Sequence, residues 1–464
     1  MTTTRWWRII AILMALSLVA TAGSDDDDTA TDDPANPADN DDGNSGDGGE
    51  INMDEELEIA EGTVLSLPDC PPDWDSEAGL SDDTITVGMS LPESGPLAAL
   101  GTMDDGMRAW FDYIEPIDGR RIQLDSVDDA YDPARTLNNV QDALETNEPF
   151  AFTSLLGTAN NLAVRDPLHD ECIPQLFNAT GLPAWGDPET YPWTIGGLLP
   201  FHAEAKIWCN YIEQEMGTDT TVAALYMDND FGSVYDEAVR ACADEGQFDL
   251  VETATHDPAA PDITDELTTL AASAADVVLL GTTGAACPQA MAVIAGSNWD
   301  PETFLSYTCQ FIPAYFAPID PAGEGVIVAT AYKEPGQLDD EAVTEVRQVL
   351  EDAGLNPDEG SYFVGVALAQ LAEQTFRAAA EMEGGLNRVN VMRAVWNADI
   401  SHPLGLNGAT TRTDGANDAY LAEASLLARY VPPAEGERIG RYEPISDLIE
   451  LEGQTGSVTR PGAG

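Results

Sequence analysis

The sequence predicts an α/β protein in which short strands and amphipathic helices alternate along most of the chain. The opening run ITVGM (85–89) is too short for a helix, and a loop rich in proline and glycine (92–96) follows it. From 103 to 114 apolar residues recur every three or four positions, which indicates one apolar face on a helix. The order strand, loop, helix, strand is typical of a parallel sheet with right-handed connections.

The same alternation continues along the chain and predicts two wound lobes of mainly parallel sheet. We expect lobe one at 82–196 and 331–408, lobe two at 197–330 and 409–432, and a C-terminal tail at 433–464. The chain would pass between the lobes near 194–199, 325–331 and 405–413, and three such crossings would form a hinge. The expected helices after the first are 134–146, one after 157, 201–216, 234–245, 263–274, 340–353 and 362–382, and the later strands are 150–156, 173–181, 222–227, 251–255, 276–281 and 304–307.

Three motifs in order make the fold more specific. The first loop reads SGPLAALG (94–101), the second strand ends in DDAYDP (128–133), and VAALYM (222–227) continues into DNDFGSVYDEA (228–238). Together they resemble the type I periplasmic binding proteins, in particular the branched-chain amino-acid (Leu/Ile/Val) binding components of ABC transporters. The resemblance covers 84–431. It implies a monomer without a cofactor that binds a small polar molecule between its lobes and delivers it to an ABC permease.

The resemblance also implies which residues hold the head group of the ligand. Thr158, Ala159 and Asn160 fall where the family binds a carboxylate through hydroxyl and N–H groups at a helix start. Ala179 and Thr180 fall on a second contact made by backbone and hydroxyl groups. The alternative for these residues is ordinary helix capping by threonine and asparagine.

Two aromatic residues and three departures from the family pattern complete the expected site. Phe231 falls on an aromatic that closes over the ligand from lobe two, and Tyr362 begins the long helix where an aromatic is also common. Either could instead be a core residue. Leu100 stands where an aromatic is expected, Thr283 where a tyrosine is expected, and the stretch ending at Gln310 lacks the carboxylate that would hold an ammonium group. An amide, a small organic acid or a neutral solute therefore fits about as well as a leucine-like amino acid.

The N-terminus predicts export. Basic residues, an apolar run (9–20) and the small residues Ala-Thr-Ala (20–22) form the pattern of a secretory signal peptide, 1–22. The run is shorter than the roughly 20 apolar residues that span a membrane. Residues 23–81 follow as an acidic, disordered tether, because so few apolar residues cannot offset the entropy of ordering. We expect an extracytoplasmic protein, and the lack of a cysteine before Cys70 argues against a lipid anchor.

The charge of the chain excludes nucleic-acid binding. It has 83 acidic and 19 basic residues and a net charge of −64, whereas phosphate contacts need clusters of lysine and arginine. An acidic tether accounts for only part of this excess, because the acids continue through the folded region. We therefore expect a halophilic surface, suited to saline surroundings in which counterions screen self-repulsion.

Six cysteines in an exported chain indicate disulfides rather than free thiols or a metal site. The expected lobes place Cys70 and Cys172 together and leave the other four cysteines in lobe two, which allows three pairings. Among these we favour Cys70 with Cys172, Cys209 with Cys242 on neighbouring helices, and Cys287 with Cys309 beside the cleft.

The common enzyme motifs are absent from the sequence. The four histidines show no ligand-like spacing, and neither a nucleophile elbow nor a phosphate-binding glycine loop occurs. Asp128, Asp129 and Asp132 could form a catalytic pair or a calcium site, but their place between a strand and a helix favours capping of backbone N–H groups. We expect a binding protein, and the alternatives are a sensory protein of the same fold and a secreted hydrolase.

Overall fold

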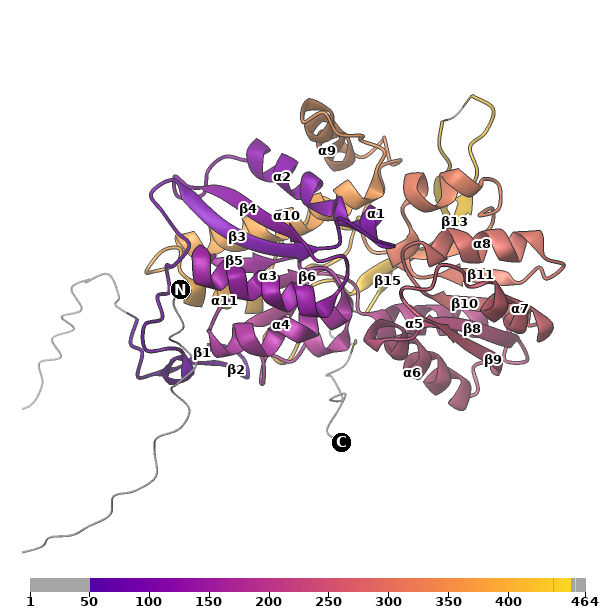
Figure 1. The fold of residues 1–464 in the computed structure, drawn as a ribbon, viewed down its shortest axis with the longest axis horizontal. Coiled ribbons are helices and arrows are strands. Elements are labelled where there is room, and N and C mark those ends of the chain that lie inside the picture. The colour runs from indigo at the N-terminus through magenta and orange to yellow at the C-terminus, as the bar shows by residue number, and fades with distance from the viewer. Residues whose placement is uncertain (1–50, 437, 452–454, 456–464) are drawn as a thin grey trace, which may run out of the picture. The chain divides into compact units, whose positions relative to one another are not determined.

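The computed structural model of the protein describes residues 51–436, 438–451 and 455. These residues form two α/β lobes, each built on one sheet, as the sequence predicts (Figure 1). The expected signal peptide, 1–22, and the first part of the expected tether, 23–50, lie outside the described residues.

Lobe one is a five-stranded parallel sheet covered by helices. Its strands are β3 (Thr84–Leu91), β4 (Arg121–Asp128), β5 (Ala151–Thr153), β6 (Gln175–Asn178) and β7 (Thr194–Gly196), and its helices are α1 (Ala98–Gly101), α2 (Met103–Tyr113), α3 (Pro133–Thr146), α4 (Thr158–Asp170), α9 (Glu341–Asp352), α10 (Gly360–Glu381) and α11 (Arg388–Trp396). The strand order is β4-β3-β5-β6-β7. Helices α2 and α10 lie on one face and α3 and α4 on the other (Figure 1). Because both faces are covered, strands such as β3 are largely apolar and buried.

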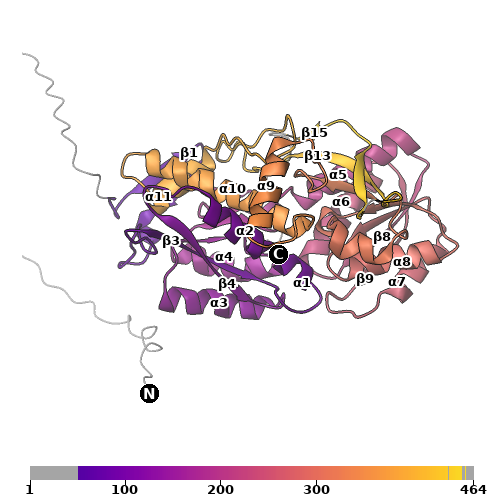
Figure 2. The same ribbon diagram turned by 90° about the horizontal axis from the view of Figure 1, so that it is seen from above.

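Lobe two is a larger sheet that is mostly parallel. Its strands are β8 (Thr221–Met227), β9 (Asp249–His256), β10 (Val277–Gly281), β11 (Glu302–Leu305), β12 (Ile327–Thr330), β13 (Ala424–Val431), β14 (Arg441–Pro444) and β15 (Ile449–Glu450), and its helices are α5 (Phe201–Tyr211), α6 (Asp230–Asp244), α7 (Thr264–Ala272) and α8 (Ala286–Gly296). The order is β14-β13-β12-β11-β10-β8-β9, with β13 antiparallel to β12 and to β14. Helices α5 and α6 cover one face, and α7 and α8 cover the other (Figure 2).

The three crossings between the lobes are tied to one another. The hydroxyl group of Tyr332 in the second crossing donates to the carbonyl oxygen of Gly197 in the first. The N–H group of Lys333 donates to the carbonyl oxygen of Leu404 in the third at 2.8 Å, and Tyr332 pairs with Gly405. These bonds hold the three crossings of the hinge in fixed positions relative to one another.

Helices α2 and α10 lie side by side although about 260 residues separate them along the chain (Figure 2). Two glycines allow this approach. A Cβ at Gly365 would lie 2.0 Å from the carbonyl oxygen of Met103, and one at Gly106 would lie 2.3 Å from that of Tyr362. Because a larger side chain at either glycine would push the helices apart, the pair sets where the first turns of α2 and α10 stand.

The prediction of a disordered tether is wrong for residues 51–81. This segment forms the hairpin β1 (Glu56–Ala60) and β2 (Thr63–Ser66) and buries Ile59, Leu65 and, just after the hairpin, Leu67. The fully buried guanidinium of Arg388 in α11 donates to the carbonyl oxygen of Asp75 at 3.1 Å and to two more carbonyl oxygens of lobe one. These contacts order the segment although its acidic composition predicts disorder.

The prediction of a separate C-terminal tail is also wrong for its described part. Strands β14 and β15 both pair with β13 and so extend the sheet of lobe two. The sequence reading also missed β13, α8 and α11. The three favoured disulfides are confirmed, with Cα atoms 5.5 Å apart in Cys70–Cys172, 6.2 Å in Cys209–Cys242 and 5.8 Å in Cys287–Cys309.

The hairpin of residues 56–66 offers a direct test, because neighbouring residues of β2 differ in burial. Leu65 is 0% exposed and Val64 is 41% exposed. We expect Leu65→Ala to lower the free energy of unfolding by about 2–5 kcal/mol, as for other buried leucines. Val64→Ala should change it by less than about 0.5 kcal/mol. Denaturant unfolding measures both, and equal, negligible effects would mean that the segment behaves as a tether.

Candidate ligand-binding site

A cavity lies where the two lobes meet, at the carboxyl ends of their strands. Its lining residues follow β3, β4, β5 and β6 in lobe one and β8, β10 and β11 in lobe two, and further ones come from the crossings and from the start of α10. This is the edge at which open parallel sheets bind ligands. Most of the lining side chains are less than 10% exposed, so a molecule in the cavity would be largely removed from water.

The structure brings most of the sequence-predicted site residues to this cavity. Those that line it are Leu100, Thr158, Ala179, Thr180, Phe231, Thr283 and Gln310. Ala159, Asn160 and Tyr362 are not part of the lining. Asn160 turns away from it, because its side-chain amide donates to the hydroxyl oxygen of Thr136 at 2.7 Å. Ser361 and Val364 of the same helix line the cavity in place of Tyr362.

The sequence reading missed an aromatic part of the lining. It consists of Tyr131, Phe201, Tyr307, Phe311 and Tyr332. Phe201 packs on Phe231 at 4.8 Å and on Tyr307 at 5.7 Å between ring centroids. A signal for several of these residues was present, because Tyr131 and Tyr307 follow the ends of predicted strands, where a ligand was expected.

Helix α4 begins at the cavity, and Thr158, its first residue, is part of the lining. Helix α4 begins at Thr158 after Gly157, whose φ of 102° is readily adopted only by glycine. The N–H groups of a first helical turn have no partners within the helix and carry the positive end of its dipole. A carboxylate is a suitable partner for such groups.

Two threonine hydroxyls stand beside these donors. The Oγ1 atoms of Thr158 and Thr180 are 2.7 Å apart and hydrogen-bonded to each other. Two hydroxyls carry two protons and their mutual bond uses one, so one O–H donor remains for a ligand. By contrast, the N–H groups of Ala179 and Thr180 donate to Leu155 and Asn178, so the second contact expected from the family pattern is limited here to side-chain and carbonyl groups.

Lobe two contributes polar atoms that lack partners. Within the described chain, Oγ1 of Thr283 and Oε1 of Gln310 are buried and have no hydrogen-bond partner. Buried polar atoms are nearly always hydrogen-bonded, so this pair indicates a second polar contact in the cavity. Cys309 precedes Gln310 directly and Cys287 follows Thr283 in the next turn of chain, so the Cys287–Cys309 disulfide joins the segments that carry both residues.

The described residues that line the cavity include no Asp, Glu, Lys, Arg or His. The nearest carboxyl behind the wall belongs to Glu204, which is fully buried and accepts hydrogen bonds from the Tyr235 hydroxyl and from the N–H of Tyr307 at 2.8 Å. Burial raises the pKa of Glu204 from 4.5 to about 8. At neutral pH this carboxyl is therefore mostly protonated, and it adds little negative charge behind the cavity.

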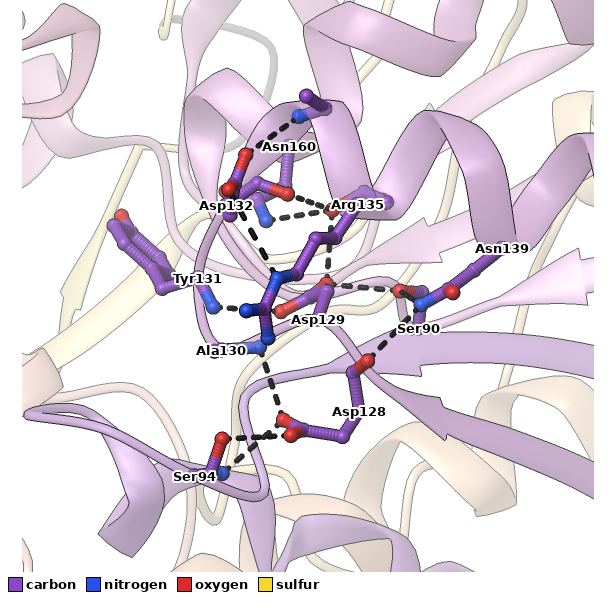
Figure 3. A network of polar contacts seen from close by, with 12 residues as sticks. Ser90, Ser94, Asp128, Asp129, Ala130, Tyr131, Asp132, Arg135, Asn139 and Asn160 are labelled. Atoms are coloured by element: carbon purple, nitrogen blue, oxygen red, sulfur yellow. Dashed lines mark hydrogen bonds and ion pairs between the residues drawn. The ribbon is translucent and has the colours of Figure 1, made fainter.

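The three aspartates of the DDAYDP motif are engaged with backbone and hydroxyl groups (Figure 3). Asp132 caps α3 by accepting from the N–H of Ala134 at 2.9 Å, and Asp128 accepts from the hydroxyl and N–H of Ser94. These contacts match the structural role that the sequence favoured. In the part of the chain that is described, no group of at least three His, Cys, Asp or Glu side chains could hold a metal ion.

The sequence from 84 to 426 matches a family model described as periplasmic binding protein. The chain belongs to this family. No curated protein sequence matches this periplasmic binding protein. Among the described residues, no helix combines the length and apolar character that crossing a membrane requires.

Solved structures with the same fold include three proteins of ABC transport systems. A branched-chain amino-acid transporter protein from Thermus thermophilus with bound valine is 17% identical, with a TM-score of 0.70, covering 80% of this chain and 97% of its own. A solute-binding protein from R. palustris in complex with 4-hydroxybenzoate is 16% identical, with a TM-score of 0.69 and coverage of 82% and 100%. A fatty-acid transporter substrate-binding protein from Thermomonospora curvata is 16% identical, with a TM-score of 0.71 and coverage of 84% and 98%. These likenesses establish the type I fold.

The buried carboxyl of Glu204 gives a pH test of the cavity wall. Folding raises the pKa of Glu204 from 4.5 to about 8. The contribution of this group to the free energy of unfolding is therefore complete below pH 4.5 and is lost as the pH rises through about 8. Glu204→Gln keeps a neutral group of similar shape, with an NH2 donor group and a carbonyl acceptor. We expect the melting temperature of this variant, relative to the wild type, to rise between about pH 5 and about pH 9.

Glu215→Gln, at an exposed acid that follows the same helix, serves as the control for this measurement. A difference between Glu204→Gln and the wild type that stays constant with pH would show that Glu204 is ionised in the folded protein.

Proposed function

We propose that this periplasmic binding protein is the extracytoplasmic receptor of an ABC importer and that it captures an apolar monocarboxylate without an ammonium group. The family and the ABC-transport context of the similar structures support the general role. Capture in the cavity between the lobes and delivery to a permease are the finer parts of the proposal. We further propose that the protein acts outside the cytoplasm as a monomer.

The head group of the ligand is inferred from the donors at α4. The first-turn N–H groups and the Thr158–Thr180 hydroxyl pair supply donors at one end of the cavity. Hydrogen bonds to an ionised group are shorter and stronger than those to a neutral one, so a carboxylate uses these donors best. An ordinary capping role for Thr158 is not observed, because its hydroxyl bonds to Thr180 rather than to the first turn of α4.

The lack of an acidic lining residue is the observation that carries the choice of ligand class. A buried ammonium group needs an acid or several carbonyl oxygens as partners. Burying an unpaired ammonium costs much more free energy than burying an unpaired neutral group. The described lining offers no carboxylate, and the carboxyl of Glu204 lies behind the wall and is mostly protonated. An amino acid would therefore bury its ammonium group without a counter-charge. An organic acid has no ammonium group and avoids this cost.

The body of the ligand is inferred from the apolar part of the wall. The same cavity that holds the head-group donors is lined by Leu97, Leu100, Met103, Phe201 and Phe231. Burial of a ligand's carbon skeleton against such side chains contributes roughly 25 cal/mol for each Å² removed from water. A branched or aromatic skeleton of modest size fits this surface better than a polar one.

Matched pairs of small molecules test the ligand class. We expect 3-phenylpropionate and 4-methylpentanoate to raise the melting temperature, with a stabilisation of about 2.7 kcal/mol at a hundredfold excess over the dissociation constant. Phenylalanine and leucine have the same skeletons with an added ammonium group and should give a much smaller shift. Stabilisation by the amino acids and not by the acids would overturn the proposed class.

Substitution of Thr158 tests the head-group contact. Thr158→Val keeps the shape of the side chain and removes the hydroxyl, so binding of 3-phenylpropionate should weaken by about 1.5–3 kcal/mol, the range for a hydrogen bond to a charged group. Thr158→Ser should retain most of the affinity. Thr268→Val, at an exposed threonine of α7, controls for the substitution itself. Titration calorimetry measures all three, and full affinity in Thr158→Val would remove Thr158 from the site.

A further inference from the structure

Tyr131 stands in an unusual backbone conformation at the edge of the cavity. Ala130 has a φ of 50° and Tyr131 a φ of 63°, so two consecutive residues with side chains adopt the left-handed region. This region is unfavourable for residues other than glycine, and it persists only where the surroundings impose it. Such outliers gather at functional sites.

Two carboxylates hold this conformation (Figure 3). Asp128 accepts from the N–H of Ala130 at 2.9 Å, and Asp129 accepts from the N–H of Tyr131 at 2.8 Å. The second oxygen of Asp129 accepts from the hydroxyls of Ser90 at 2.8 Å and of Thr136 at 2.9 Å. Asp129 is 0% exposed, so its position is fixed by β3 and α3.

The side chain of Tyr131 points away from this network, and its ring lines the cavity (Figure 3). The ring lies against Gly157, because a Cβ there would come within 2.5 Å of its Cε2 atom. Burial raises the pKa of Tyr131, and the nearby side chain of Asn229 partly offsets this. Asn229 caps α6 of lobe two, so the ring extends from the head-group donors of lobe one to the helix that carries Phe231.

We propose that Tyr131 is a specificity-determining residue that covers the ligand next to its carboxylate, and that Asp129 is the positioning residue that presents it. The proposal rests on the proposed function in so far as the cavity is the ligand site. A ring beside Gly157 sets the width available to the first carbons of a ligand's skeleton. It favours a flat aromatic body, which can pack against it, over a branched one.

Substitutions at Tyr131 distinguish the role of its ring from the effect of its backbone conformation. Tyr131→Gly removes the ring and relieves the left-handed strain, so the ligand-free protein stays folded. We expect its affinity for 3-phenylpropionate to fall at least about tenfold, and its preference for this acid over 4-methylpentanoate to fall with it. Tyr131→Phe should stay within about threefold of the wild type, because it keeps the ring. Tyr113→Ala, at a tyrosine that is 53% exposed, is the matched control and should not change the affinity.

A double-mutant cycle tests the positioning role of Asp129. Asp129→Asn keeps one acceptor oxygen, which cannot accept from the N–H of Tyr131 and from the two hydroxyls at once. The variant should therefore bind more weakly, as Tyr131→Gly does. The two changes together should be no worse than Tyr131→Gly alone, because both act through the same ring. If Asp129→Asn does not fold, Ser90→Ala takes its place and removes one donor to the carboxylate. Additive losses would show that Asp129 affects binding independently of the ring, and unchanged binding in Asp129→Asn would show that it acts only on stability; either result overturns the positioning role.

Probes with different head groups distinguish a failure of this proposal from a failure of the proposed function. Calorimetry is repeated with 3-phenylpropionamide and phenylalanine, which share the skeleton of 3-phenylpropionate. If one of them binds in place of the acid, the proposed ligand class is wrong, and the Tyr131 variants are compared with that probe. If Tyr131→Gly binds the preferred probe as the wild type does, with an unchanged preference between skeletons, the role of Tyr131 is overturned.

Discussion

No charged side chain is found among the described residues that line the cavity, and the rest of the proposed site depends on this constraint. Any charge on the ligand must be met by neutral groups with oriented dipoles. The first turn of α4 and the Thr158–Thr180 pair provide several donors in one place. They lie together because β5 and β6 are adjacent parallel strands, and the residues that follow such strands meet at one edge of the sheet.

The large negative charge of the protein acts against an anionic ligand at a distance but not at the site. With a net charge of −64, the chain repels anions in dilute salt. At an ionic strength of about 0.15 M the Debye length is about 8 Å, so most of this repulsion is screened before the ligand reaches the cavity. Inside, the low dielectric strengthens the N–H and hydroxyl contacts, and the mostly protonated carboxyl of Glu204 adds little repulsion.

The fold and part of the site could be predicted because local sequence signals carry them. The loop 94–101 and the strand ends near Thr158 and Thr180 follow from apolar runs and breakers. The conformation of Tyr131 could not be predicted, because bonds from a buried aspartate impose it after folding. The hairpin of residues 56–66 was missed for a related reason, since its few apolar residues gain stability only against lobe one. Helix α8 lacks a side-chain cap and contains Pro288, so its start carries no clear signal.

The most direct test of the central claim is a crystal structure of the protein soaked or grown with 3-phenylpropionate. The account predicts a carboxylate within hydrogen-bond distance of the first-turn N–H groups of α4 and of a threonine hydroxyl, with the phenyl group among Phe201, Phe231 and Tyr131. Electron density for the acid at another place, or an empty cavity at saturating acid, would contradict it. So would a carboxylate that faces Thr283 and Gln310 and leaves the α4 donors to water.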